Sequence, residues 1–150
     1  MLGVQAGNLP EFGFMPRVPL ISEAIERTEI DMKLGNMLFE AKLTEGGFQV
    51  QRAELVERYR DFKEVFECCQ LPRAMRKYVS YQLIRNVLAA HAVGMDFCTL
   101  LDARRPDLLE DWYSILRMHS IDNSSRQVQG LDVARAGLLF APCFTEFSER

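Results

Sequence analysis

The sequence predicts a single α/β domain in which helices flank a mixed sheet. Residues 28–34 and 37–44 alternate apolar and polar side chains around Gly35-Asn36, a dipeptide suited to a tight hairpin turn. A long apolar stretch with helical spacing, residues 72–92, comes later, and the short apolar run 96–101 soon follows it. A helix between a hairpin and a buried strand is typical of a crossover connection, so we expect that strand to join the hairpin's sheet.

Two elements are expected before the hairpin. Gly and Pro recur in residues 1–19, which predicts an irregular arm or a short strand packed on the core. A helix is expected over 20–27, with Ser22 as its N-cap and with acidic residues in its first turns, where the helix dipole favours them. Ile21 and Ile25 would lie on its buried side.

Beyond the hairpin, the pattern predicts mainly helices. We expect a third short strand at 48–50 and a helix over 52–67, whose aromatic residues recur at helical spacing. A further helix is expected over 106–118, where Pro opens the first turn. The polar stretch 122–129 predicts a loop, and a final apolar segment spans 131–140.

The composition is typical of a globular domain, with 48% hydrophobic and 26% charged residues in 150. No apolar run approaches the length that crosses a bilayer, and the N-terminus lacks the basic start of a signal peptide. We therefore expect a cytoplasmic protein with no membrane partner, and we leave open that the sequence belongs to a longer chain.

Several classes of site lack their signatures. The 4 cysteines show no metal-ligand spacing, so we expect free thiols in place of a zinc site or a disulfide framework. Neither His91 nor His119 sits with Ser, Cys or paired acids, as acyl transfer would require. The glycines form no phosphate-binding loop, which makes nucleotide-dependent enzymes poor candidates.

The net charge of -3 argues against a protein that coats nucleic acid through a large positive excess. Basic residues nevertheless cluster locally. A first cluster, within 52–63, has acids at the spacing of helical ion pairs and is typical of a solvated helix face. A second cluster has fewer acids nearby, so its Arg73, Arg76 and Lys77 are the candidates for phosphate contacts.

The hairpin carries the most informative side chains. With the turn at Gly35-Asn36, counting outward places Asp31 opposite Glu40. The next pair on the same face is Glu29 and Lys42. Carboxylates opposite each other repel unless a cation lies between them or one stays protonated, and Mg²⁺ prefers a few carboxylates together with water and phosphate. The alternative is a solvated face on which Glu29 and Lys42 form an ordinary cross-strand pair.

These residues resemble the PD-(D/E)xK nuclease superfamily, which includes many restriction endonucleases. The match is Asp31, followed nine positions later by Glu40-x-Lys42, on a hairpin preceded by the expected acidic helix. The later segment 81–86 is similar to the Gln-containing helix of some members. No Pro precedes Asp31, and Asn86 stands where one branch carries Tyr.

The resemblance implies a restriction-endonuclease-like fold, a mixed sheet flanked by helices, in a single domain over the whole chain. Residues 20–101 would be its catalytic core. Residues 1–19 would be the arm described above, and 102–150 a C-terminal helical extension.

The resemblance also implies a metal site. Asp31 and Glu40 would bind Mg²⁺ together with the backbone carbonyl of Ala41, and Mn²⁺ could substitute for it. Glu26 or Glu23 is a candidate extra ligand, the alternative being that these acids only serve the helix dipole.

Lys42 would position or help to deprotonate the attacking water and offset charge in the transition state, and Glu29 would tune it. Gln82 either points toward the hairpin or bonds the backbone; the sequence favours neither.

The function that the resemblance implies is Mg²⁺-dependent hydrolysis of phosphodiester bonds in DNA, by a monomer or by a homodimer that cuts both strands. The first alternative is a module that keeps the nuclease fold, cuts nothing and binds nucleic acid or a partner in a defence or repair assembly. The second is an unrelated α/β protein whose hairpin charges lie on the surface.

Overall fold

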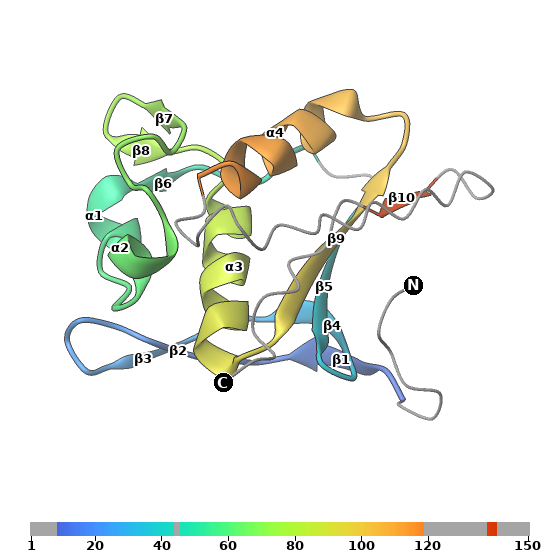
Figure 1. Ribbon diagram of the computed structural model, residues 1–150, viewed down its shortest axis with the longest axis horizontal. Helices are drawn as coiled ribbons and strands as arrows, with labels where there is room; N and C mark the ends of the chain where they lie inside the picture. The colour runs from blue at the N-terminus through green and yellow to red at the C-terminus, as the bar shows by residue number, and fades with distance from the viewer. Residues whose placement is uncertain (1–8, 44–45, 119–137, 141–150) are drawn as a thin grey trace.

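The computed structural model describes residues 9–43, 46–118 and 138–140, the last three by their backbone alone. Its main sheet has five strands in the order β1, β4, β5, β9 and β10. The β5–β9 pair is parallel, and the other neighbours are antiparallel. The predicted mixed α/β class and the crossover strand are thus confirmed, and the architecture is consistent with a restriction-endonuclease-like fold (Figure 1). The strand bounds are Glu11–Phe14, Ile30–Leu34, Met37–Lys42, Asp96–Asp102 and Leu138–Phe140.

The β4–β5 hairpin forms with the predicted register. Leu34 pairs with Met37 across the turn, and Gly35 has a φ of 60°, which Gly adopts without steric penalty. Strand β5 lies between β4 and β9, and both of its faces are covered: Leu38 belongs to the main core, and Phe39 to a smaller cluster. Because side chains alternate along a strand, Glu40 and Lys42 share the face of Leu38.

Helix α3 (Tyr81–Val93) covers that face of the sheet. It ends at Gly94, whose φ of 64° and amide bonds to the preceding turn close the helix. The chain then enters β9, as the sequence predicts. Helix α4 (Pro106–Leu116) confirms the expected helix at 106–118, and its Trp112 packs edge-on against Phe97 of β9 at 5.6 Å between ring centroids.

A second unit lies on the other side of α3 from the main sheet (Figure 1). It contains the one-turn helices α1 (Ala53–Val56) and α2 (Phe62–Val65) and a three-stranded sheet in the order β6, β8, β7. These strands, called the small sheet below, are Gln51–Arg52, Lys77–Tyr78 and Arg73–Ala74.

The helix expected over 20–27 is wrong. Residues 17–27 form a β-hairpin of β2 (Arg17–Pro19) and β3 (Ile25–Arg27), and its turn contains Glu23 with a φ of 65°. Ile21 and Ile25, expected on a buried stripe, are exposed. A helix of two turns without a buried side is marginal, and the chain instead buries Val18 and Leu20.

Two further expectations are wrong between the hairpin and α3. Residues 48–50 form no strand; the nearby β6 belongs to the small sheet, and the helix expected over 52–67 is broken into α1 and α2. Between the two helices, residues 58–60 pair with the β2–β3 segment: the Ile21 amide donates to the Arg58 carbonyl at 2.9 Å, and the Arg60 amide donates to the Pro19 carbonyl at 3.1 Å. This tertiary pairing of the backbone has overridden the helical periodicity.

The helix expected over 72–92 begins only at Tyr81, because its first part forms the β7–β8 hairpin. Met75, which the helical pattern places on the buried stripe, is fully exposed, whereas Tyr78 is buried. The exposed Lys77 next to the buried Tyr78 shows the alternation of a strand.

Of the two forms expected for residues 1–19, the described part adopts the strand and not the irregular arm: β1 is an edge strand of the main sheet, and β2 belongs to a hairpin. The extension expected as helical over 102–150 contains α4 and then β10, which pairs with β9. The loop at 122–129, His119 and most of the segment 131–140 lie outside the described residues. Among the residues with a described structure, no helix is both long and apolar enough to span a bilayer.

Candidate active site

The structure brings Asp31 and Glu40 together. The register pairs of β4 and β5 end at Met32 and Phe39, so the two acids occupy the next position outward. There the backbone amide of Ala41 donates to Oδ2 of Asp31 at 2.7 Å, which fixes this carboxylate against β5. The charge of Asp31 raises the pKa of Glu40, as expected for neighbouring carboxylates.

Glu40 is held by two amides from α3. Nε2 of Gln82 donates to one carboxylate oxygen, and Nδ2 of Asn86 donates to the other at 2.9 Å. The Glu40 side chain is 3% exposed, and burial, followed by the charge of Asp31, raises its pKa to about 7. Lys42, the Asn86 bond and Arg85 oppose this shift. Of the two roles considered for Gln82, the structure shows the one directed toward the hairpin.

Lys42 follows Glu40 on the same face and is also 3% exposed. The alternative of a solvated face is therefore wrong for these two residues. Lys42 lines an open pocket of about 490 Å³, together with residues 46–50, with Val79 and Ser80 just before α3, and with Asp111 of α4. Lys42 thus lies at a surface that a ligand can reach, and Glu40 is two residues from it on the same strand face.

The remaining predicted acids lie elsewhere. Glu26 accepts from the Tyr59 hydroxyl at 2.9 Å and pairs with Arg58, and Glu23 is exposed in the β2–β3 turn. No group of three or more His, Cys, Asp or Glu suited to a metal occurs in the part of the chain that the structure describes. The expected extra ligand is therefore corrected: without the helix at 20–27, neither acid joins the hairpin pair. Glu29 is exposed, with its carboxylate near Gly13 of β1.

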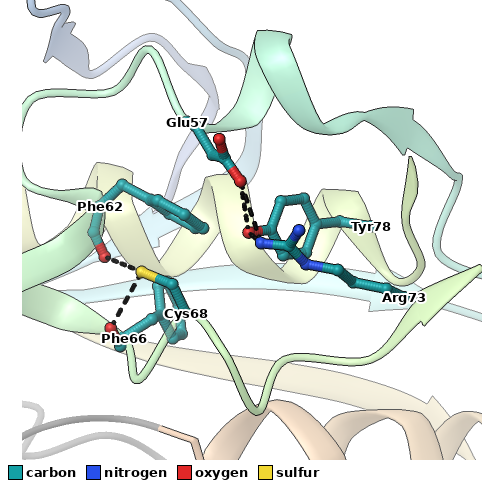
Figure 2. Close-up of polar contacts among 6 residues, drawn as sticks. All are labelled: Glu57, Phe62, Phe66, Cys68, Arg73 and Tyr78. Carbon is teal, nitrogen blue, oxygen red and sulfur yellow. Dashed lines mark hydrogen bonds and ion pairs between the residues drawn. The ribbon is translucent and has the colours of Figure 1, made fainter. Parts of the chain in front are cut away.

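Arg73, a predicted phosphate contact, is part of the structure of the small sheet. Its guanidinium lies over the ring of Tyr78 at 4.2 Å, bonds the Tyr78 hydroxyl and pairs with Glu57 at 2.9 Å (Figure 2). This expectation is corrected, because the tyrosine and the glutamate already engage the cation. Arg76 and Lys77 are exposed.

Sequence reasoning missed Asn86 and Thr99 as parts of the site. Gln82 and Asn86 are four residues apart, which puts both amides on one helix face, and this spacing was a usable signal. Thr99 is the β9 partner of Glu40 and is fully buried. Its Oγ1 and Oε1 of Gln82 are buried, and neither has a hydrogen-bond partner among the residues that the structure describes. Only the parallel pairing of β5 with β9 reveals Thr99.

The residues present fit a small divalent cation. Asp31 and Glu40 supply hard carboxylate oxygens of like charge, and a cation would relieve their repulsion. The unpartnered oxygens of Gln82 and Thr99 add polar atoms that a water on the cation could bond. Two carboxylates with water are a set that Mg²⁺ accepts.

A family model described as "Restriction Endonuclease associating with ARP" matches residues 1–135. Neither a search of curated proteins nor a search of solved structures found a match. Since the family model spans most of the 150 residues, the chain belongs to this restriction-endonuclease family, whose description names an association with ARP.

Proposed function

We propose that the chain hydrolyses phosphodiester bonds in DNA with Mg²⁺, through a PD-(D/E)xK-type site formed by Asp31, Glu40 and Lys42. The observation that carries the proposal is the buried Glu40, whose pKa of about 7 reflects burial beside a second acid. Strongly shifted acids beside a specific charge partner and an open pocket are typical of catalytic sites. Membership in a restriction-endonuclease family supports the same reaction.

Stability alone does not account for this arrangement. A buried carboxylate is tolerated when it is hydrogen-bonded or paired, and Glu40 has both amides and Lys42 nearby. Its pKa nevertheless remains raised, so these contacts do not fully compensate burial and the charge of Asp31. We infer that the missing compensation comes from a bound cation.

Asp31, Glu40 and the backbone carbonyl of Ala41 would hold the metal, and Mn²⁺ could replace Mg²⁺. The bound ion would supply charge neutralisation on the phosphate and a lowered pKa of water. The amides of Gln82 and Asn86 orient the Glu40 carboxylate so that both oxygens have fixed directions.

Lys42 would act on the water and the phosphate. It lies on the face of Glu40 and lines the pocket, so its ammonium can orient a water or offset negative charge on a phosphate that enters there. Glu29, the expected cross-strand neighbour of Lys42, would tune it electrostatically.

The test is incubation of the chain with supercoiled plasmid and Mg²⁺. Cleavage is expected for the wild type and for the control Glu54→Gln, which changes an exposed acid on α1. Asp31→Ala and Lys42→Ala should abolish cleavage while leaving the circular dichroism spectrum of the folded chain. Cleavage by both variants at the wild-type rate would refute the assigned roles.

A non-cleaving module is the second candidate, and the observation that suggests it is the association with ARP that the family description names beside the endonuclease. In this function the chain would keep the fold and the charge cluster without turnover. Calorimetric titration with Mg²⁺ separates the two: binding that Asp31→Asn and Glu40→Gln abolish supports the enzyme, and heat that is equal in all three proteins supports the module.

A further inference from the structure

The tip of the β7–β8 hairpin presents an apolar side chain to solvent. Ala74 pairs with Lys77, so Met75 and Arg76 form a two-residue turn. Met75 has a φ of 56°, a conformation for which Gly is favoured at the first position of such turns, and its side chain is 100% exposed. The backbone favours Gly here and solvent favours a polar residue. Neither preference accounts for Met, which makes a functional role worth testing.

The tip is held in place from below. The carbonyl of Arg76 accepts from the backbone amide of Ala53 at 2.9 Å, which ties the turn to the start of α1. Beneath it, Tyr78 is fully buried edge-on against Phe62, while Arg73 lies over its ring (Figure 2). Met75 therefore projects from a preorganised support, which lowers the entropy lost on binding a ligand.

Positive charge surrounds the tip. Arg52, Arg76 and Lys77 are exposed, and none of them forms an ion pair within the described residues. Arg52 and Lys77 are direct partners across β6 and β8. Other arginines of the described chain do pair with acids, namely Arg58, Arg60, Arg73, Arg104 and Arg105. A ligand that matches this surface carries several negative charges, which would meet the cations, and an apolar part between them, which would contact Met75.

The residues that flank β6 and β8 of the small sheet line the pocket of the proposed active site. Val50 and Val79 line that pocket with Lys42, and they lie two residues from Arg52 and Lys77 respectively. Val50 directly precedes β6 and Val79 directly follows β8, and Tyr78 between Lys77 and Val79 is buried. Two residues of chain span at most about 7 Å, so each cation lies within roughly two phosphates of one DNA strand from a pocket-lining valine.

We propose that the small sheet binds duplex DNA, with Arg52, Arg76 and Lys77 on phosphates and Met75 packed against bases in a groove. Phosphate contacts position a protein on the duplex, and apolar side chains reach the bases. The proposal rests on the proposed function for its ligand and adds a binding surface outside Asp31, Glu40 and Lys42.

The test measures binding of a fluorescein-labelled duplex by fluorescence anisotropy across a salt series, in EDTA, so that cleavage does not enter. Met75→Gly should weaken binding about tenfold, the order expected for one lost buried Met, with an unchanged slope against log salt. The double variant Arg76→Ala/Lys77→Ala should reduce that slope by about 2, because each phosphate contact contributes about 0.9. Met75→Leu should bind like the wild type.

The controls are Met15→Gly and Arg17→Ala, exposed residues on the β1–β2 segment, which should change neither affinity nor slope. Met75→Gly suits the turn, so its melting temperature should equal or exceed that of the wild type. Unchanged duplex affinity in Met75→Gly and in the double variant, or no duplex binding by the wild type, overturns the proposal. Plasmid cleavage, measured separately, decides the proposed function.

Discussion

Charged side chains are buried at the end of the β4–β5 hairpin, whereas those of the small sheet are paired at the surface or exposed to solvent. At the hairpin, Glu40 and Lys42 are buried, and the pKa of Glu40 stays near 7 despite two amide bonds. In the small sheet, Arg73 is shared between Glu57 and Tyr78, and Lys77 remains in solvent.

The charged contacts of the small sheet stabilise the fold, whereas the burial of Glu40 at the hairpin does not. Pairing Arg73 with Glu57 and stacking it on Tyr78 anchors a hairpin, so fold stability explains these contacts. Burying Glu40 beside Asp31 opposes the charged form of Glu40, so fold stability does not explain it. We therefore expect substitutions at the hairpin to change activity more than stability, and substitutions in the small sheet to change stability more than the chemical step.

The largest effect is expected from Glu40→Gln. Loss of the carboxylate should lower cleavage by about a thousandfold or more, since charge stabilisation at the metal is lost. The unpartnered Oε1 of Gln82 can turn to accept from the new amide, so the fold should be as stable as the wild type or more stable at pH 8. Plasmid cleavage and urea unfolding measure the two effects. Destabilisation together with full activity would reverse the comparison.

Stability of the wild type should depend on pH. The pKa of Glu40 is raised from 4.5 to about 7 on folding, so the unfolded chain loses this proton first as the pH rises. Stability should fall between pH 4.5 and 7, by about 3 kcal/mol, and level off above. Urea unfolding at each pH measures it, with Glu40→Gln as the control that lacks this decline. A wild-type decline identical to that of the variant would contradict the assignment.

Asn86→Ala tests how the carboxylate is oriented. It removes one hydrogen bond that favours the charged Glu40, so the pKa of Glu40 should rise further and cleavage should fall about ten- to hundredfold. The acidic limb of the pH–rate profile should move to higher pH, a change that mere loss of packing would not produce. An unmoved limb would show that Asn86 has only a packing role.

Tyr78→Phe is expected to have the smallest effect on chemistry. It removes the hydroxyl that donates to Glu57 and should cost about 1 kcal/mol of stability. The pH–rate profile should not change, because Tyr78 lies in the small sheet and not beside Glu40. Thermal unfolding and the profile test both statements, and a shifted profile would show that the two regions are coupled.

The same two regions differ in how far the sequence could predict them. A two-residue turn with Gly at its first position and alternating flanks determined the β4–β5 register, and with it the meeting of Asp31 and Glu40. The small sheet gave no such signal, because its turn uses Met75 where Gly is usual, and Met75 also fits a helical stripe. Local patterns of two-residue strands are too short to outweigh the helical periodicity around them.

The expectation of an extra metal ligand from Glu23 or Glu26 was wrong for a related reason. The sequence pattern predicts a helix for Glu23 and Glu26, but the chain forms the β2–β3 hairpin there, which buries Val18. Gln82 and Asn86 were within reach of sequence reasoning, since their spacing shares one helix face. Thr99 was not, because pairing between β5 and β9 is a long-range contact.

The most direct test is a ¹³C NMR titration of the Glu40 side-chain carboxyl, with and without saturating Mg²⁺. A pKa near 7 in the free chain that falls by at least about two units with Mg²⁺ would show that the buried acid is poised for a cation. A pKa near 4.5 in both titrations, unmoved by Mg²⁺, would contradict the account.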